Sequence, residues 1–277
     1  MVCGPTASGK SEVSDALADA LAREHGAFVP TLVVDSMQVY REIPTITNQA
    51  RRRPAELLGI VSVTEEWTVA RHRALAEEII AQNTTPFVLD AGTGMYLNAI
   101  LLDVPLAPRV DPEMRKLAQS VSGGATNPRR AARAKELELA GAAPRRSIWD
   151  GEPRYDTSVI YLRPDKETLD AAISRRTEEI VRGGLEEAAT LAEMQSAGAR
   201  INASVADSIG VRELTEHFSG RIVAEQARYL INTRTRQLAR RQIRWFDKLA
   251  RTLEGCVPIT VLELPTQMNT MHGRMWA

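Results

Sequence analysis

The stretch Gly4-Pro-Thr-Ala-Ser-Gly9-Lys10-Ser11 decides the fold. It matches the phosphate-binding pattern G-x-x-x-x-G-K-[ST] at every fixed position and precedes a helical pattern at 12–25. Its glycines let backbone N–H groups turn toward an anion, and the helix start adds a partial positive charge. Lys10 reaches the outer phosphate, and the Ser11 hydroxyl can hold Mg²⁺. The loop therefore predicts phosphate binding without naming a reaction.

The segments around this loop alternate between short apolar runs and helical patterns. The predicted strands are 31–34, 86–89 and 158–162, and the predicted helices are 65–82, 165 to about 195 and about 224–253. This alternation predicts an α/β protein, a P-loop NTPase-like parallel sheet flanked by helices. Met1–Cys3 is short for the strand that precedes such a loop, so we expect that strand to be truncated.

The composition changes between residues 105 and 153, where Ala, Arg, Gly and Pro dominate and the one helical pattern is 128–139. We interpret this stretch as a small helical insertion. The predicted domains are a catalytic core at 1–104 and 154–265, a shortened insertion lobe at 105–153 and a tail at 266–277.

Composition and charge narrow the class of protein. The 35 basic and 35 acidic residues cancel, which argues against nucleic-acid binding through bulk charge. Cys3 and Cys256 have no metal-ligand or disulfide spacing, and no run of about 18 apolar residues or secretion signal occurs. We therefore expect a cytoplasmic protein without a membrane segment, and a monomer.

One segment is strongly basic despite the neutral total. From Arg228 to Arg251 the chain has eight basic residues against Asp247 alone. The helical period places the less charged positions on one packing face: Ile231, Thr235, Leu238, Gln242, Trp245 and Leu249. A charged helix face is usually only solvated, but this excess favours contact with single-stranded RNA.

Five motifs follow one another in a specific order. They are GPTASGKS at 4–11, DSMQVYR at 35–41, AGTGMYL at 91–97, IGVREL at 209–214 and TRTRQLARRQIRWF at 233–246. Together they resemble the motifs of the tRNA dimethylallyltransferase family, also called the tRNA isopentenyltransferase or IPP transferase family. The last motif distinguishes this family from P-loop kinases, which share only the first.

The resemblance implies an activity and its residues. A member transfers a dimethylallyl group from dimethylallyl diphosphate to N6 of the adenosine 3′ of the anticodon, releasing diphosphate, with Mg²⁺ on Ser11. The implied catalytic residues are Asp35, the proton acceptor, and Thr93. The implied diphosphate contacts are Gly4, Pro5, Thr6, Ala7, Ser8, Gly9, Lys10, Ser11 and Arg176. The implied contacts with the tRNA anticodon stem-loop are Ser36, Met37, Gln38, Arg115, Arg236, Gln237, Arg240, Arg241 and Arg244.

Departures from the family pattern keep alternatives open. The family's usual Gly-Thr-Ala-Lys is replaced by Ile-Thr-Asn-Gln at 46–49, and the arginine expected at position 172 is Ala172. The lobe is shortened and lacks the arginine-rich segment that the family has before its Leu-Glu-Val helix. An adenylate isopentenyltransferase acting on free AMP, ADP or ATP would keep the loop and Asp35. A small-molecule P-loop kinase would bind ATP in the loop and use Asp90 as its Walker-B acid. A non-catalytic RNA-binding relative is the remaining alternative.

Overall fold

The computed structural model describes residues 1–106, 110–121, 128–141 and 147–263, and its sheet has five parallel strands. The strands are β1 (Val2–Cys3), β2 (Thr31–Val34), β3 (Val88–Ala91), β4 (Val159–Leu162) and β5 (Ile259–Leu262). Their order is β2-β3-β1-β4-β5, so the short β1 lies between β3 and β4. This confirms the predicted fold class. Open parallel sheets bind ligands at the carboxyl ends of their strands, where the loop after β1 begins.

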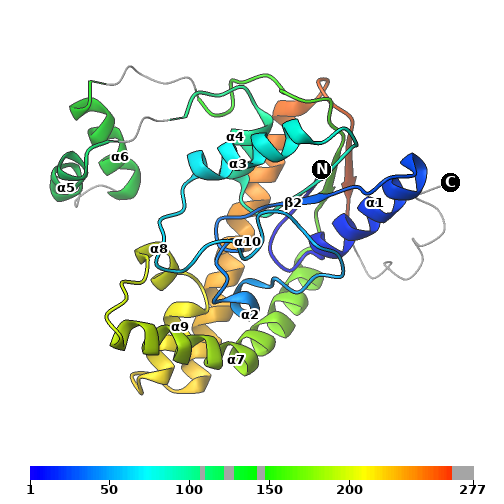
Figure 1. The fold of residues 1–277 in the computed structure, drawn as a ribbon. Helices are drawn as coiled ribbons and strands as arrows, with labels where there is room; N and C mark the ends of the chain where they lie inside the picture. The colour runs from blue at the N-terminus through cyan, green and yellow to red at the C-terminus, as the bar shows by residue number, and fades with distance from the viewer. Residues whose placement is uncertain (107–109, 122–127, 142–146, 264–277) are drawn as a thin grey trace.

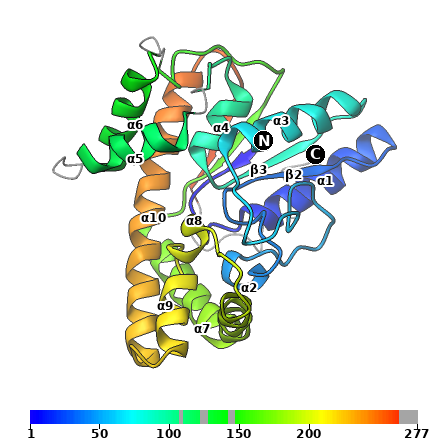
Figure 2. The same ribbon diagram turned by 60° about the vertical axis from the view of Figure 1, so that its left-hand side comes forward.

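Helices flank this sheet and extend beyond it (Figure 1). They are α1 (Lys10–His25), α2 (Pro44–Thr47), α3 (Val69–Gln82), α4 (Gly94–Leu101), α5 (Pro112–Val121), α6 (Pro128–Leu139), α7 (Lys166–Ser196), α8 (Ala203–Ala206), α9 (Val211–Phe218) and α10 (Ala224–Leu253). Figure 2 shows α10 as a long rod that runs past the sheet and on to α7 and α9.

The two faces of the sheet bury different helices because successive strand side chains point to opposite sides. Val2 and Leu162 pack in one cluster with Leu17 of α1. Cys3 and Tyr161 belong to a second cluster that includes residues of α3, α4 and α10. The helix after the phosphate-binding loop therefore covers one face, and α4 and α10 cover the other.

Several predicted elements differ from the observed ones at their ends. The helix predicted at 65–82 begins at Val69, because the Thr68 side chain caps it by accepting a hydrogen bond from the Arg71 backbone N–H. The strand predicted at 86–89 lies at Val88–Ala91, which places Asp90 inside it. The short helices α2, α4, α5, α8 and α9 and the strand β5 were not predicted.

Helices α5 and α6 pack on each other and lie away from the sheet (Figure 1). The chain leaves the core and returns to it at one place, since Asp103 N–H donates to Glu152 O at 2.9 Å and Arg154 N–H donates to Leu101 O at 2.8 Å. An inserted lobe needs its two connecting segments to lie side by side, and these hydrogen bonds join 101–103 to 152–154. The domain boundaries at 104, 105, 153 and 154 stay a prediction, and the tail at 266–277 lies outside the described residues.

Candidate functional site

The loop after β1 forms a tight cradle. A Cβ at Gly4 would lie 2.6 Å from the backbone oxygen of Leu162, so only glycine lets β1 and β4 approach this closely. Gly9 has a φ of 81° and Ala7 a φ of 62°, both in the left-handed region. The Ser8 hydroxyl is buried without a hydrogen-bond partner in the described part of the chain. An unsatisfied donor inside a strained loop fits an anion site.

Lys10 supplies the charge of this cradle. Its ammonium donates to Pro5 O at 2.7 Å. Burial lowers the pKa of Lys10, whereas the negative charges of Asp90 and Asp35 oppose that change. A half-buried cation at this position is stabilised further by a bound phosphate.

Asp35 follows β2 and is held by the backbone. Its Oδ1 accepts hydrogen bonds from the N–H groups of Met37 at 2.8 Å and Gln38 at 3.3 Å, and its Oδ2 accepts one from Thr93 Oγ1 at 3.3 Å. Burial raises the pKa of Asp35, and these hydrogen bonds and Lys10 offset part of that rise. A half-buried carboxylate with a raised pKa is suited to accept a proton.

Gly92 brings Asp35 and the cradle together. A Cβ at Gly92 would lie 2.6 Å from Asp35 Oδ2 and 3.8 Å from Lys10 Cε, so the bare backbone lies between the two side chains. The next residue, Thr93, also accepts a hydrogen bond from Ser36 N–H at 3.2 Å. The structure thus places the predicted pair Asp35 and Thr93 beside the predicted phosphate site.

A buried ionic network lies behind Ser11. Ser11 Oγ donates to Asp90 Oδ2 at 2.9 Å, and Arg51 contacts Asp90 at 2.5 Å and Asp15 at 2.8 Å. The side chains of Arg51, Asp15 and Asp90 are only 3 to 4% exposed. Sequence reasoning assigned no role to Arg51 or Asp15, and it considered Asp90 only for the kinase alternative.

The oxygens of Ser11 and Asp90 fit a magnesium ion. Mg²⁺ takes oxygen ligands and is usually held by one or two carboxylates together with substrate phosphates. No group of three or more His, Cys, Asp or Glu residues able to bind a metal occurs among the described residues. Ser11 and Asp90 offer a hydroxyl and a carboxylate, and the phosphates of a ligand would complete a metal site there.

Gln242 of α10 also reaches the cradle. Its Oε1 accepts a hydrogen bond from Thr6 N–H at 2.8 Å, and its Nε2 donates to Gly92 O at 2.8 Å. The helical period predicts Gln242 on the packing face of this helix and indicates no function for it. The available signal was its chemistry, since a carboxamide on a packing face must find partners.

The arginines of α10 between positions 228 and 244 divide into two groups. In the first group, Arg228 pairs with Glu178 at 2.9 Å, Arg236 pairs with Asp170 at 3.2 Å, and Arg234 pairs with the buried Glu213. The second group comprises Arg240, Arg241 and Arg244, which are exposed and whose side chains make no ion pair or hydrogen bond within the described ranges. Gln237 is exposed next to this second group.

Other predicted contacts lie elsewhere or serve the protein itself. Arg176 donates to Thr45 O and pairs with Glu179 at 2.9 Å, so both contacts are with the protein itself. Gln38 Nε2 donates to Thr47 O and Asn48 O, both at 2.9 Å. Met37 packs against the core. Arg115 belongs to α5, and its side chain lies outside the described residues.

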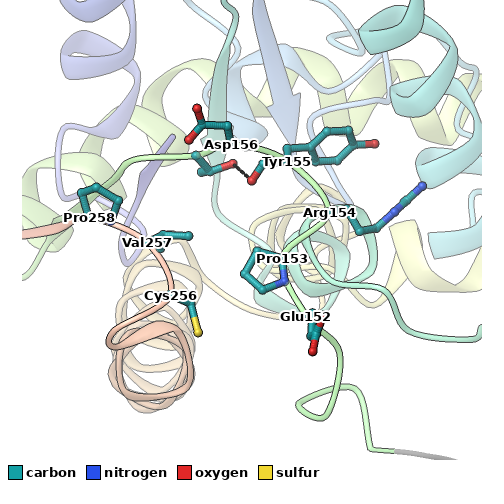
Figure 3. A pocket seen from close by; sticks show the side chains of 9 residues that line it. Glu152, Pro153, Arg154, Tyr155, Asp156, Cys256, Val257 and Pro258 are labelled. Carbon is teal, nitrogen blue, oxygen red and sulfur yellow. Dashed lines mark hydrogen bonds between the residues drawn. The ribbon is translucent and has the colours of Figure 1, made fainter.

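A separate hollow of about 500 Å³ opens at the opposite edge of the sheet (Figure 3). It is lined by residues 152–157, which precede β4, and 256–258, which precede β5. These are the amino ends of the strands, whereas Asp35, Gly92 and the cradle are at the carboxyl ends. The hollow is therefore not part of the candidate site.

Among the described residues, no helix combines the length and the apolar character needed to cross a membrane.

Comparisons with known proteins assign the chain to a family. It is 60% identical to the tRNA dimethylallyltransferase of Rubrobacter xylanophilus over 98% of this chain and 96% of the relative, and 33% identical to that of Kineococcus radiotolerans over 89% and 87%.

Solved structures share the fold. The tRNA isopentenylpyrophosphate transferase of Bacillus halodurans has a TM-score of 0.68 at 24% identity and covers 95% of this chain and 88% of its own. A eukaryotic dimethylallyltransferase acting on tRNA has a TM-score of 0.71 at 22% identity, over 97% and 75%. The IPP transferase family model matches residues 38–126 and 124–249. By these matches, and as its motifs predicted, the chain belongs to the IPP transferase family.

Proposed function

We propose that this chain transfers a dimethylallyl group from dimethylallyl diphosphate to N6 of the adenosine 3′ of the anticodon in tRNA, releasing diphosphate. The observation that carries this proposal is the meeting of Lys10 and Asp35 on either side of Gly92, which puts a phosphate site beside a proton acceptor. The reaction is taken from the relatives in Rubrobacter xylanophilus and Kineococcus radiotolerans, which are both named tRNA dimethylallyltransferases.

The donor binds with its diphosphate in the cradle. An allylic diphosphate ionises readily once the charge that builds on its leaving oxygens is stabilised. The N–H groups of the cradle, the ammonium of Lys10 and the Ser8 hydroxyl provide donors for those oxygens. Mg²⁺, held by Ser11 and Asp90, supplies further charge neutralisation there when bound. We keep Arg176 as an additional diphosphate contact, which requires it to leave Thr45 O.

The acceptor amine gives its proton to Asp35. The N6 amine of adenosine is a weak nucleophile, so it needs positioning and a group that takes its proton as the new C–N bond forms. Asp35 Oδ2 takes that proton, while the Met37 and Gln38 N–H groups hold Oδ1 in place. Thr93 orients Oδ2 and, next to it, the reacting amine.

The RNA reaches this site along α10. The target adenosine is stacked in the anticodon loop, so it must be extruded into the pocket. Exposed Arg240, Arg241 and Arg244 have no protein partner among the described residues and are free to contact phosphates. The proposal includes two further sets of contacts. The extruded base contacts Ser36, Met37 and Gln38. The rest of the RNA contacts Arg115, Arg236 and Gln237.

The exposed arginines also weigh against transfer to a free adenine nucleotide, which would not use them. We further propose that the protein works in the cytoplasm and that it acts as a monomer.

Nucleoside mass spectrometry tests the proposal. Cells that lack this modification should gain N6-dimethylallyladenosine in tRNA when they express this chain and should not gain it with the Asp35→Asn variant. Purified protein should convert tRNA in preference to AMP, ADP or ATP. Unmodified tRNA in the presence of folded protein would overturn the proposal, and preferential product on AMP would replace it with the adenylate reaction. Transfer of phosphate from ATP would replace it with a kinase.

A further inference from the structure

Gln242 joins two loops that come from distant parts of the sequence. Its Oε1 accepts from Thr6 N–H in the phosphate-binding loop, and its Nε2 donates to Gly92 O in the loop after β3, both at 2.8 Å. The two ends of the carboxamide are thus both used. A carboxamide has one acceptor end and one donor end, so it matches an N–H group on one loop and a carbonyl on the other.

Contacts of the two nearby residues Ile243 and Trp245 also hold α10 beside these loops. Ile243 packs in a small cluster with Ala7 of the phosphate-binding loop. Trp245 packs directly on Gly94, where a Cβ would come within 2.2 Å of the ring, and its Nε1 donates to Asn98 Oδ1 at 3.1 Å. Packing therefore attaches the helix, and the directional bonds of Gln242 fix the spacing of the loops beside it.

The spacing of these loops matters for the reaction. Gly92 lies between Lys10 and Asp35, and Thr93 donates to Asp35 Oδ2. A movement of the Gly92 carbonyl would shift Thr93 and Asp35 relative to the diphosphate. Misplacement of reacting groups by about 1 Å can lower a rate about 100-fold.

We propose that Gln242 is a positioning residue that fixes the phosphate-binding loop against the Gly92–Thr93 loop, so that the bound donor and the proton acceptor Asp35 stay aligned. This inference rests on the proposed transfer reaction. Gln242 is also next to Arg241, so the element that fixes the two loops is the one proposed to contact the RNA.

Two substitutions separate the roles of the carboxamide. Gln242→Leu removes both hydrogen bonds, and we expect kcat to fall roughly 10- to 100-fold with a smaller change in the KM for dimethylallyl diphosphate. Gln242→Glu keeps an acceptor for Thr6 N–H but sets a carboxylate against Gly92 O, close to the diphosphate. We expect it to raise this KM as well as to lower kcat.

The pH profile distinguishes positioning from a structural role. The hydrogen bond from Thr93 lowers the pKa of Asp35 against the larger effect of burial. Loosening Thr93 should therefore move the acidic limb of the kcat profile to higher pH in Gln242→Leu. A structural residue would change the melting temperature and leave this limb where it is.

Amide hydrogen exchange tests the contact without using activity. The Thr6 amide should exchange slowly in the wild type and in Gln242→Glu, and faster in Gln242→Leu. The matched control is Gln195→Leu on α7, an exposed glutamine whose side chain makes no hydrogen bond within the described residues, and it should match the wild type throughout.

The outcomes are separable. A wild-type protein that makes no prenylated tRNA defeats the proposed function, and the positioning role falls with it, whatever the exchange data show. An active wild type with unchanged kcat, KM and acidic limb in Gln242→Leu overturns the positioning role alone. Equal Thr6 exchange in all variants overturns the contact itself.

Discussion

The donor side and the acceptor side of the site are built in opposite ways. On the donor side, the polar groups around the cradle are buried or half-buried and most are bound to another part of the protein, as in the chain from Ser11 to Asp90, Arg51 and Asp15. On the acceptor side, the charges that matter are exposed and lack protein partners in the described part of the chain, as for Arg240, Arg241 and Arg244.

The difference follows from what each side binds. A small diphosphate is enclosed, so its ligands must be preorganised in a water-poor loop. A large RNA meets a surface through its phosphates, and exposed arginines attract these without a fixed pocket. Substitutions on the donor side should therefore change turnover and stability, whereas substitutions on the acceptor side should change salt-dependent affinity.

The largest expected effect is on turnover at Asp35. Asp35→Asn keeps an oxygen for the Met37 and Gln38 N–H groups but removes the proton acceptor. We expect kcat to fall by roughly 10² to 10⁴. Titration calorimetry with dimethylallyl diphosphate should show unchanged donor affinity. Loss of donor binding together with turnover would instead make Asp35 a structural residue.

The next largest effect concerns the buried network. Arg51→Met leaves the carboxylates of Asp15 and Asp90 buried without their cation, which should cost about 3 to 5 kcal/mol of folding free energy. Denaturant unfolding measures this change. The control, Arg52→Met, removes an ion pair with Asp19 in which the arginine side chain is 65% exposed, and should cost at most about 1 kcal/mol. Equal losses of folding free energy in the two variants would show that the buried ion pairs of Arg51 contribute no more than the exposed pair of Arg52.

A smaller effect is expected for the unpaired arginines. The triple variant Arg240→Ala, Arg241→Ala and Arg244→Ala should weaken tRNA binding. The slope of log affinity against log salt should become shallower by roughly 0.7 to 0.9 for each RNA phosphate that the variant no longer neutralises. Arg228→Ala is the matched control, because this arginine already pairs with Glu178 and Glu225. A triple variant with the wild-type salt slope would show that these arginines do not meet RNA.

The smallest effect is on the pH dependence of stability. Burial raises the pKa of Asp35 in the folded protein, so the fold favours the protonated acid relative to the unfolded chain. That stabilisation is present at low pH and is lost as the pH rises through the raised pKa. Asp35→Asn should therefore melt at a higher temperature than the wild type at neutral pH, with the gap closing on acidification. If the difference in melting temperature widens on acidification, the pKa of Asp35 is lowered in the folded protein and not raised.

Much of the donor side was predictable from the sequence because its signals are local. The glycine and lysine spacing at 4–11 predicted a phosphate loop, and strand β2 lies at 31–34 as predicted, directly before Asp35. The strand containing Asp90 was placed two residues early, since Pro86 and Phe87 continue its apolar run. The network of Arg51 was missed because a run of three arginines at 51–53 resembles an ordinary solvated segment.

The sequence by itself determined the α/β fold class, the phosphate loop, the basic character of α10 and the family, because each depends on residue type and spacing along the chain. Only the tertiary structure decided which arginines of α10 are already paired, that Arg51 is buried against Asp15 and Asp90, and that Gln242 joins Thr6 to Gly92. The hydrogen bonds from Arg51 to Asp15 and from Thr6 to Gln242 span 36 and 236 positions along the chain. Hydrogen bonds and ion pairs depend on distances in space, which packing of the helices on the sheet sets and local sequence does not encode.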